Sequence, residues 1–163
     1  MFVRTASERD LERVRALLVE TWHATYDAIY GAERVTEITN SWHSIASLQR
    51  RLTRPHSEFL VADDGKQVGG MAYAEADETG AEVMLRQLYV LPELQGRGIG
   101  GMLLDEIFES FPEARAFRLE VEEKNERAIA FYQSNGFENV GSVSNCGRDD
   151  SGIPALIYER KFD

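Results

Sequence analysis

One stretch, Leu88 to Phe111, constrains most strongly what this chain can fold into. It begins with the apolar run LYVL, which favours a strand, and Pro92 then ends the strand because proline has no N–H for the ladder. A glycine-rich loop follows, with Gly96, Gly98, Gly100 and Gly101. After the loop, apolar residues recur at helical spacing at Met102, Leu103, Ile107 and Phe108. The stretch therefore predicts a strand, a glycine loop and an amphipathic helix.

A glycine loop that leads into a helix N-terminus is a site for an anion. The first N–H groups of the helix have no helical partner, and the positive end of the helix dipole lies at the same place. Phosphate groups commonly bind there. The chain carries a net charge of −10, so a positive site must be built locally, by the loop amides together with Arg97. The loop therefore predicts a phosphorylated ligand.

The same glycines also match a dinucleotide-binding fingerprint. Gly96, Gly98 and Gly101 satisfy G-x-G-x-x-G, and Glu120 lies about 20 residues farther on, where an acid would contact a ribose. The context argues against this interpretation, because the residues PELQ separate the strand from the first glycine and a strand meander precedes the motif. A dinucleotide-binding oxidoreductase is therefore a minor alternative. A nucleoside-triphosphate P-loop is excluded, because the loop has no Gly-Lys-Ser/Thr.

Composition and length fit one domain over residues 1–163. Hydrophobic residues make up 43% of the 163 residues, which is enough for a core. The single cysteine, Cys146, cannot form an intramolecular disulfide and suggests a reducing compartment, and it has no histidine at metal-ligand spacing, so no metal is expected. The N-terminus has no signal-peptide pattern and no apolar run is long enough for a membrane span, so we expect a cytoplasmic protein. The acidic charge argues against nucleic acid as a partner.

The order of the patterns predicts an α+β domain with a mixed sheet. Strands are expected at Phe2–Thr5, Phe59–Ala62, Val68–Glu75, Ala81–Leu91, Ala116–Glu122, Phe137–Val143 and Ala155–Phe162. Helices are expected from Ser7 to about Thr21, after Ser44, after the glycine loop, and from Asn125 to about Asn135. The aromatic segment Trp22–Gly31 either continues the first helix or forms a wall. A crossover helix joins the strand ending at Leu91 to the strand beginning at Ala116, so these two strands should be parallel.

Three sequence motifs together resemble those of the GCN5-related N-acetyltransferases (GNAT). The loop QGRGIG, Gln95 to Gly100, resembles the family signature Q/R-x-x-G-x-G/A, and LYVLPE before it matches as well. The segment NERAIAFYQSNGF, Asn125 to Phe137, resembles the second signature, N-x-x-A-x-x-x-Y-x-x-x-G-F. The resemblance implies a central, mostly antiparallel sheet flanked by helices, with a splay between two parallel central strands. It also implies acetyl-CoA as the cosubstrate.

The resemblance assigns a cofactor-binding role to two segments and one helix cap. The pantetheine arm would pair with the backbone of the third meander strand, and the pyrophosphate would lie on the loop amides. Asn125 would cap its helix and contact the cofactor arm. The expected cofactor-binding residues are Leu88, Tyr89, Val90, Gln95, Gly96, Arg97, Gly98, Ile99, Gly100, Gly101 and Asn125.

The same resemblance suggests the groups that transfer protons. Tyr132 matches the family tyrosine that protonates the coenzyme A thiolate, although a tyrosine on this helix face could be a packing residue alone. Glu120 lies five residues before Asn125, a spacing that resembles the ribosomal-protein N-terminal acetyltransferases, in which a glutamate accepts the amine proton. A glutamate paired with an arginine, or solvated, is an equally open interpretation of Glu120. The preceding strand, MLRQ over Met84–Gln87, lacks the glutamate that many relatives carry there.

We therefore predict an N-acetyltransferase that transfers the acetyl group directly to an amine. Trp22, His23 and Tyr26 are expected in the acceptor pocket, and His43 and His56 are expected to have no special role. His23 is also kept as an alternative base, because a histidine can accept a proton near pH 7. The acceptor would be a small amine, a polyamine or a peptide N-terminus, and the acidic charge favours a cationic one. A homodimer is allowed. The alternative from a different class is a coenzyme A-binding sensor or interaction module without catalysis.

Overall fold

The computed structural model describes residues 1–144 and 153–162, and Cys146 and most of the loop before the last strand lie outside them. Contacts divide the chain into two compact units, each described by itself. The first unit holds Met1–Ala74 and Gln87–Ser110, and the second holds Glu75–Arg86 and Phe111–Asp163. The prediction of one domain stays a prediction.

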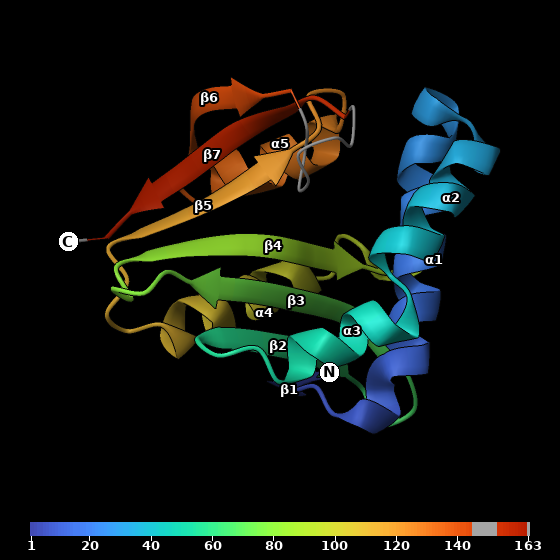
Figure 1. The fold of residues 1–163 in the computed structure, drawn as a ribbon, viewed down its shortest axis with the longest axis horizontal. Coiled ribbons are helices and arrows are strands. Elements are labelled where there is room, and N and C mark those ends of the chain that lie inside the picture. Colours follow the sequence, from blue (N-terminus) through green and yellow to red (C-terminus); the bar gives the residue numbers. More distant parts are fainter. Residues whose placement is uncertain (145–152, 163) are drawn as a thin grey trace. The chain divides into compact units, whose positions relative to one another are not determined.

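The strands form one seven-stranded sheet in the order β1-β2-β3-β4-β5-β7-β6 (Figure 1). Their bounds are β1 Phe2–Thr5, β2 Ser57–Asp63, β3 Val68–Ala76, β4 Glu82–Val90, β5 Ala116–Val121, β6 Glu138–Val143 and β7 Ala155–Lys161. β4 and β5 are parallel, with the register running from Glu82↔Ala116 to Leu85↔Leu119, whereas β1–β2, β5–β7 and β6–β7 are antiparallel. The predicted mixed sheet with a parallel central pair is confirmed.

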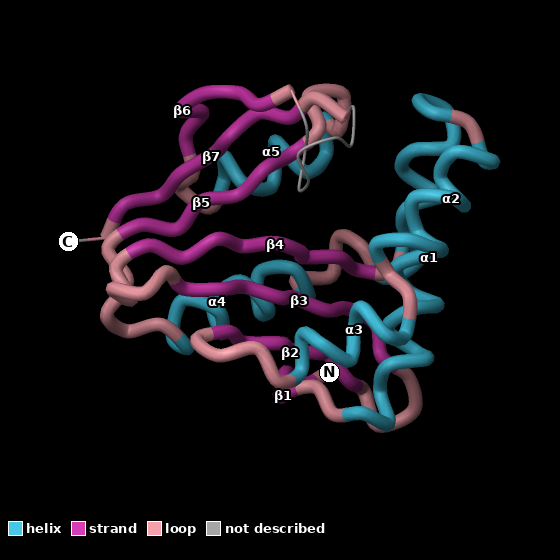
Figure 2. Tube along the Cα trace, in the orientation of Figure 1, coloured by secondary structure: helices cyan, strands magenta, loops and turns pink. Residues whose placement is uncertain are grey.

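Five α-helices accompany these strands in the described residues (Figure 2). They are α1 Leu11–Tyr30, α2 Ala32–Trp42, α3 Ile45–Leu52, α4 Ile99–Ser110 and α5 Glu126–Ser134. Short 3₁₀ turns precede α1 at Glu8–Asp10 and follow β4 at Pro92–Leu94. None of the described helices combines the length and the hydropathy needed to cross a bilayer.

The first three helices differ from the sequence prediction in one respect. α1 runs through the aromatic segment to Tyr30, well beyond Thr21, and a separate helix, α2, follows it directly. Gly31, at φ 86°, separates the two helices with a backbone conformation that other residues avoid. Both helices belong to the first unit and lie side by side in Figures 1 and 2. The prediction of two helices before the meander was therefore wrong, because three are present.

The core of the first unit lies where α1 and α3 pack on strands β2 and β3. Side chains from α1, such as Leu18, and from α3, such as Leu48, are fully buried there with Val61 and Met71. Because side chains alternate across a strand, the neighbours of Met71 in β3 belong to the opposite face of the sheet. Gly70 is one of them, and a Cβ there would lie 3.0 Å from Leu103 Cδ1 and 3.2 Å from Ile99 Cγ2 of α4. α4 therefore packs on the face opposite to α1.

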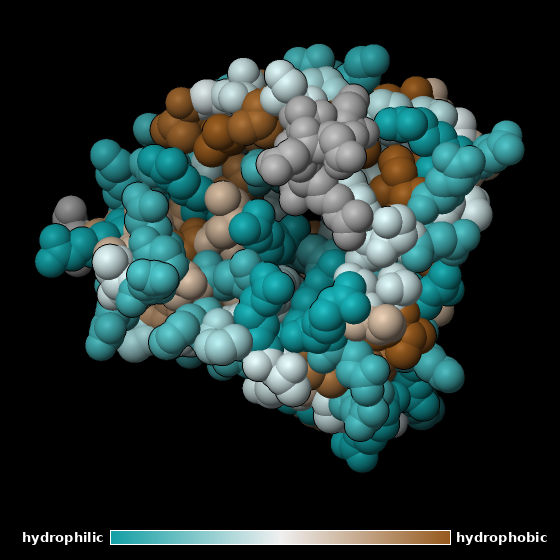
Figure 3. Space-filling view, in the orientation of Figure 1, coloured by the Kyte–Doolittle hydropathy of each residue, from teal (hydrophilic) through white to brown (hydrophobic). Residues whose placement is uncertain are grey.

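The second unit surrounds β5 with β7 and β6. β5 buries alternate residues, including Phe117 and Leu119, and its pairing with β7 continues to Val121↔Leu156. β6 lies at the end of the strand order, and its pairing with β7 is irregular between Asn139 and Gly141. A bulge of this kind twists a strand and protects a sheet edge from pairing with other chains. On the face drawn in Figure 3 hydrophilic residues predominate, in keeping with the net charge of −10.

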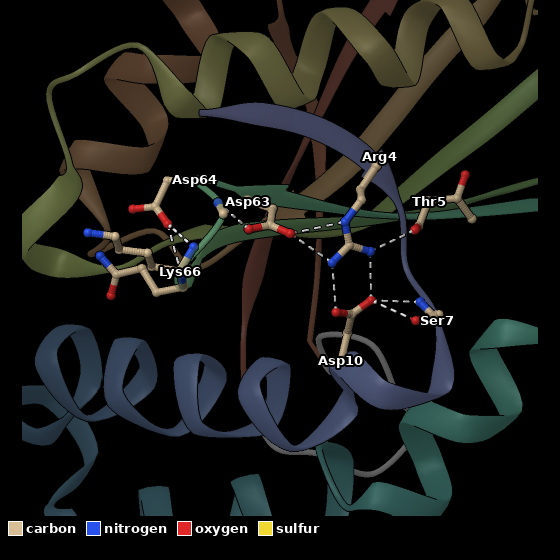
Figure 4. Close-up of polar contacts among 9 residues, drawn as sticks. Arg4, Thr5, Ser7, Asp10, Asp63, Asp64 and Lys66 are labelled. Atoms are coloured by element: carbon tan, nitrogen blue, oxygen red, sulfur yellow. Dashed lines mark hydrogen bonds and ion pairs between the residues drawn. The ribbon is translucent and has the colours of Figure 1, made fainter.

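A salt-bridge cluster ties the N-terminal strand to α1 and β2 (Figure 4). Arg4 contacts both oxygens of Asp10 at 2.8 Å and one oxygen of Asp63 at 3.0 Å. Asp10 also accepts hydrogen bonds from the backbone N–H and hydroxyl of Ser7, which completes a capping box. The hydrogen bonds from Arg4, followed by those from Ser7, hold the pKa of the Asp10 carboxyl well below its ordinary value.

We expect Asp10→Asn to destabilise the chain by about 2 kcal/mol at neutral pH, because Arg4 loses its most buried partner. A carboxyl whose pKa is lowered on folding stabilises the fold above its unfolded pKa, near 4, and this contribution disappears as the pH falls further. The difference between the wild type and Asp10→Asn in urea unfolding should therefore shrink between pH 5 and pH 2. Asp63→Asn, which removes the more exposed partner, is the control and should cost less. A difference that stays constant over this pH range would contradict the prediction.

Candidate functional site

The predicted cofactor loop is an exposed glycine turn that ends at the first residue of α4. Gly96 and Gly98 adopt φ 80° and 85°, and an added Cβ at either position would meet no atom within 4 Å. The N–H of Met102 donates to the carbonyl of Gly98 at 3.1 Å, which is the first helical bond of α4. The N–H groups of Ile99, Gly100 and Gly101 therefore have no helical acceptor. The loop combines these amides with open space beside them, which fits a phosphate group.

The segment that leads from β4 into this loop is held by two short-range bonds. Gln95 donates from its side-chain amide to the carbonyl of Val90 at 3.1 Å. The N–H of Leu94 donates to the carbonyl of Leu91 at 2.9 Å within the 3₁₀ turn. These bonds fix the end of β4 relative to the start of the loop. Gln95 therefore has a structural role beside its predicted cofactor contact.

The predicted proton donor lies in the second unit on α5. Tyr132 is the buried residue of that helix, with 8% of its surface exposed. Its ring is edge-on to Phe131 at 5.2 Å and to Phe137 at 5.6 Å between ring centroids. The backbone N–H of Phe137 also donates to the carbonyl of Tyr132 at 3.0 Å. Tyr132 is thus positioned by packing, which a proton donor requires, although the packing role alone explains these contacts equally well.

Two further predicted residues lie on neighbouring elements of the same unit. Asn125 caps α5, because its side-chain oxygen accepts the N–H of Ala128 at 3.3 Å. Glu120 is a half-buried residue of β5, opposite Ile157 in β7, and it alternates with the buried residues of its strand. The nearby arginine of this strand, Arg118, is paired with Glu159. The catalytic assignments of Tyr132 and Glu120 stay predictions.

The predicted acceptor residues separate into two groups within the first unit. Trp22 and Tyr26 are buried, at 5% and 7% exposure, with ring centroids 4.5 Å apart. Trp42 and His43, at the end of α2, join them with centroids 5.6 Å from Trp22. We call these four residues the aromatic cluster. The indole nitrogen of Trp22 is buried and has no hydrogen-bond acceptor among the described residues.

His23 takes part in a different arrangement on the same helix. Its Nδ1 lies 2.6 Å from a carboxylate oxygen of Asp27, one turn along α1, and its Nε2 lies 3.3 Å from the hydroxyl of Thr36 in α2. The carboxylate requires a proton on Nδ1. His23 therefore connects α1 to α2, and the structure does not group it with the aromatic cluster.

Sequence reasoning missed a buried polar network beside this cluster. Gln87 of β4 and His43 have only 7% and 2% of their surfaces exposed, and Gln87 Nε2 lies 3.2 Å from His43 Nδ1. Arg51 of α3 donates to Gln87 Oε1 at 2.7 Å. No pattern in the residues near His43 indicated that it would be part of a buried network. The absence of a glutamate at Gln87, noted above, was the one hint.

No group of three or more histidine, cysteine, aspartate or glutamate side chains suited to a metal occurs in the described part of the chain. The candidate site residues of the first unit, in the glycine loop, supply backbone amides, and those of the second unit, on β5 and α5, supply a carboxylate, a side-chain amide and a tyrosine hydroxyl. Such groups can bind an anionic cosubstrate and move protons.

The family profile described as an acetyltransferase (GNAT) domain matches residues 55–139, which is just over half of the chain. The chain belongs to the GNAT acetyltransferase family. This confirms the predicted fold family and the predicted enzyme class, an acetyl-CoA-dependent N-acetyltransferase. The matched range contains the glycine loop, Glu120, Asn125 and Tyr132.

Similar proteins include enzymes with different acceptors. N-alpha-acetyltransferase RimI of Mycobacterium tuberculosis is 36% identical over 100 residues, which cover 59% of this chain and 61% of that protein. Spermidine N(1)-acetyltransferase of Thermoplasma acidophilum is 28% identical over 99% of this chain and 97% of that protein. Among solved structures, the PaiA N-acetyltransferase of T. acidophilum in complex with coenzyme A has a TM-score of 0.86 and 26% identity, covering 99% of this chain and 98% of that one.

We expect Gly98→Ala to weaken acetyl-CoA binding about tenfold or more in calorimetry, because an L-residue at φ 85° costs about 1–2 kcal/mol and the loop would shift. Gly65→Ala is the matched control, since Gly65 has φ 92° and open space but lies in the turn between β2 and β3. Both variants should lose thermal stability, and only Gly98→Ala should lose affinity. Equal acetyl-CoA affinities in the two variants would show that the loop is not part of the cofactor site.

Proposed function

We propose that this protein transfers the acetyl group of acetyl-CoA directly to an amine, with both substrates bound at once. The observation that carries the proposal is the glycine turn at the start of α4, whose free amides suit the pyrophosphate of coenzyme A. A solved relative with 26% identity over nearly the whole chain was crystallised with coenzyme A, which supports the same cosubstrate here. Family membership favours this interpretation over the dinucleotide alternative.

The proposed reaction involves four heavy atoms, which are the amine nitrogen and the carbonyl carbon, carbonyl oxygen and sulfur of the thioester. The neutral amine nitrogen attacks the thioester carbonyl carbon, and its proton passes to the Glu120 carboxylate, directly or through water. The carbonyl oxygen becomes an oxyanion, for which a backbone N–H of Leu88–Val90 is the proposed donor. The C–S bond then breaks, and the leaving thiolate takes the hydroxyl proton of Tyr132. The products are the N-acetylated amine and coenzyme A.

Tyr132→Phe keeps the ring contacts of Tyr132 and removes only its hydroxyl. We expect kcat to fall by about 10²-fold, because the thiolate loses its proton donor, while the acetyl-CoA dissociation constant changes little. Thiol release with a panel of polyamines and short peptides measures kcat, and calorimetry measures the dissociation constant of acetyl-CoA. Unchanged turnover would end the proton-donor role. A wild type that binds acetyl-CoA yet acetylates no amine would favour the sensor alternative.

Glu120→Gln removes the proposed base without changing the size of the side chain. We expect kcat/KM to fall by about 10²-fold, because the attacking amine loses its proton acceptor. Glu123→Gln, at an exposed position shortly after β5, is the control for the loss of one negative charge. If both variants lose activity equally, the effect is electrostatic and Glu120 is not the base.

A further inference from the structure

The buried polar network of the first unit fixes the orientation of one amide. Arg51 Nη1 lies 2.7 Å from Gln87 Oε1. A guanidinium group can only donate hydrogen bonds, so the Gln87 atom that faces it must be the carbonyl oxygen. The amide nitrogen of Gln87 then faces His43, at 3.2 Å from Nδ1.

The fixed amide in turn determines where His43 carries its proton. An amide nitrogen only donates, so Nδ1 of His43 must accept, and the proton of the neutral ring is on Nε2. A proton added to Nδ1 would set two donors against each other inside a buried site, which is costly. The network therefore holds His43 as a neutral hydrogen-bond donor and prevents it from acting as a base.

Arg51 itself has little freedom to reorient. Its Nη2 donates to the carbonyl of Trp42 at 2.8 Å, and the guanidinium lies 5.7 Å from the ring centroid of Tyr73. The hydroxyl of Ser47, one turn earlier on α3, donates to the same carbonyl at 3.0 Å. Arg51 is thus a positioning residue that acts on His43 through Gln87.

The neighbour of His43 in the aromatic cluster is also a donor. The Trp22 ring lies 5.6 Å from the His43 ring, and its indole N–H is buried without an acceptor among the described residues. A buried donor left without an acceptor costs free energy that a ligand oxygen can recover. In the same unit, Gln87 directly precedes Leu88–Val90, the proposed cosubstrate segment of β4.

We propose that Arg51 and Gln87 hold His43 with its proton on Nε2, and that the N–H groups of His43 and Trp22 favour an acceptor amine that also carries a carbonyl oxygen, as a peptide end does. This rests on the proposed function and names its acceptor class. Apart from the reacting nitrogen, a polyamine offers only cationic nitrogens, which donate hydrogen bonds and would face two further donors. A peptide end offers the amine together with an acceptor oxygen.

The proton position can be measured without any activity. Long-range ¹⁵N–¹H correlation spectra of the labelled protein distinguish Nδ1–H, Nε2–H and the cationic imidazole. We expect the neutral Nε2–H pattern for His43 between pH 5.5 and 8, assigned by comparison with His43→Gln. His23 should show the proton on Nδ1 in the same spectrum. Gln87→Glu retains a partner for Arg51 and should move a proton onto His43 Nδ1. A wild-type His43 protonated on Nδ1 would overturn the proposed proton position.

The acceptor class is tested with two matched amines, alaninamide, which has a carbonyl, and isopropylamine, which has none, with spermidine as the polyamine. We expect Trp22→Phe to lower kcat/KM for alaninamide about tenfold more than that for isopropylamine. Trp42→Phe, which removes a second indole from the cluster, should affect the two amines equally. An equal loss in Trp22→Phe, or a wild-type preference for spermidine, would overturn the proposed class. If the wild type neither binds acetyl-CoA nor acetylates any amine, the proposed function fails, whereas the spectra still decide on which nitrogen His43 carries its proton.

Discussion

Close packing between α4 and Gly70 of β3 sets the position of the candidate cofactor loop. A side chain at Gly70 would press on Ile99 and Leu103, the residues that anchor the first turns of α4. Because Ile99 is both the first residue of the helix and a packing residue, the same contact that buries apolar surface also places the free amides. The position of the candidate anion site is therefore a consequence of how the helix packs, and the exposed glycines Gly96 and Gly98 complete the loop.

The opposite face of the same strands is held together by a different combination of interactions. There α1 and α3 bury aliphatic side chains against β2 and β3, and a polar network crosses from α3 to β4 through Arg51 and Gln87. Such a network tolerates only one arrangement of its hydrogens, since a guanidinium group and an amide nitrogen can only donate and must each face an acceptor. It gives the end of α2 and the middle of β4 a defined relationship, which apolar packing alone would specify less sharply.

Local signals in the sequence were sufficient for most of the elements. The glycine loop, the Asn125 cap and the helix after Ser44 are decided within a few residues, and the structure confirms each of them. The extent of α1 could not be decided in this way, because Trp22 becomes a helical core residue only through contacts with Trp42 and His43, which follow in α2 and at its end. Gly31 looks like an ordinary loop glycine until the helix after it is seen.

The polar network was beyond sequence reasoning for a related reason. Gln87 is separated from Arg51 and His43 by 36 and 44 positions, and glutamine and arginine are ordinarily found at the surface. Nothing in the neighbouring residues of His43 distinguishes it from His56, which is exposed. Only the tertiary contacts show that one histidine is a buried donor and the other is not.

Charge alone cannot select the acceptor in such a protein. A net charge of −10 attracts every cationic amine by the same long-range field, so it raises encounter rates without distinguishing a polyamine from a peptide end. Discrimination has to come from uncharged groups at short range, where a buried donor penalises a ligand that lacks the matching oxygen. In the proposal above, Trp22 and His43 supply donors of this kind, and Arg51 acts on His43 through Gln87.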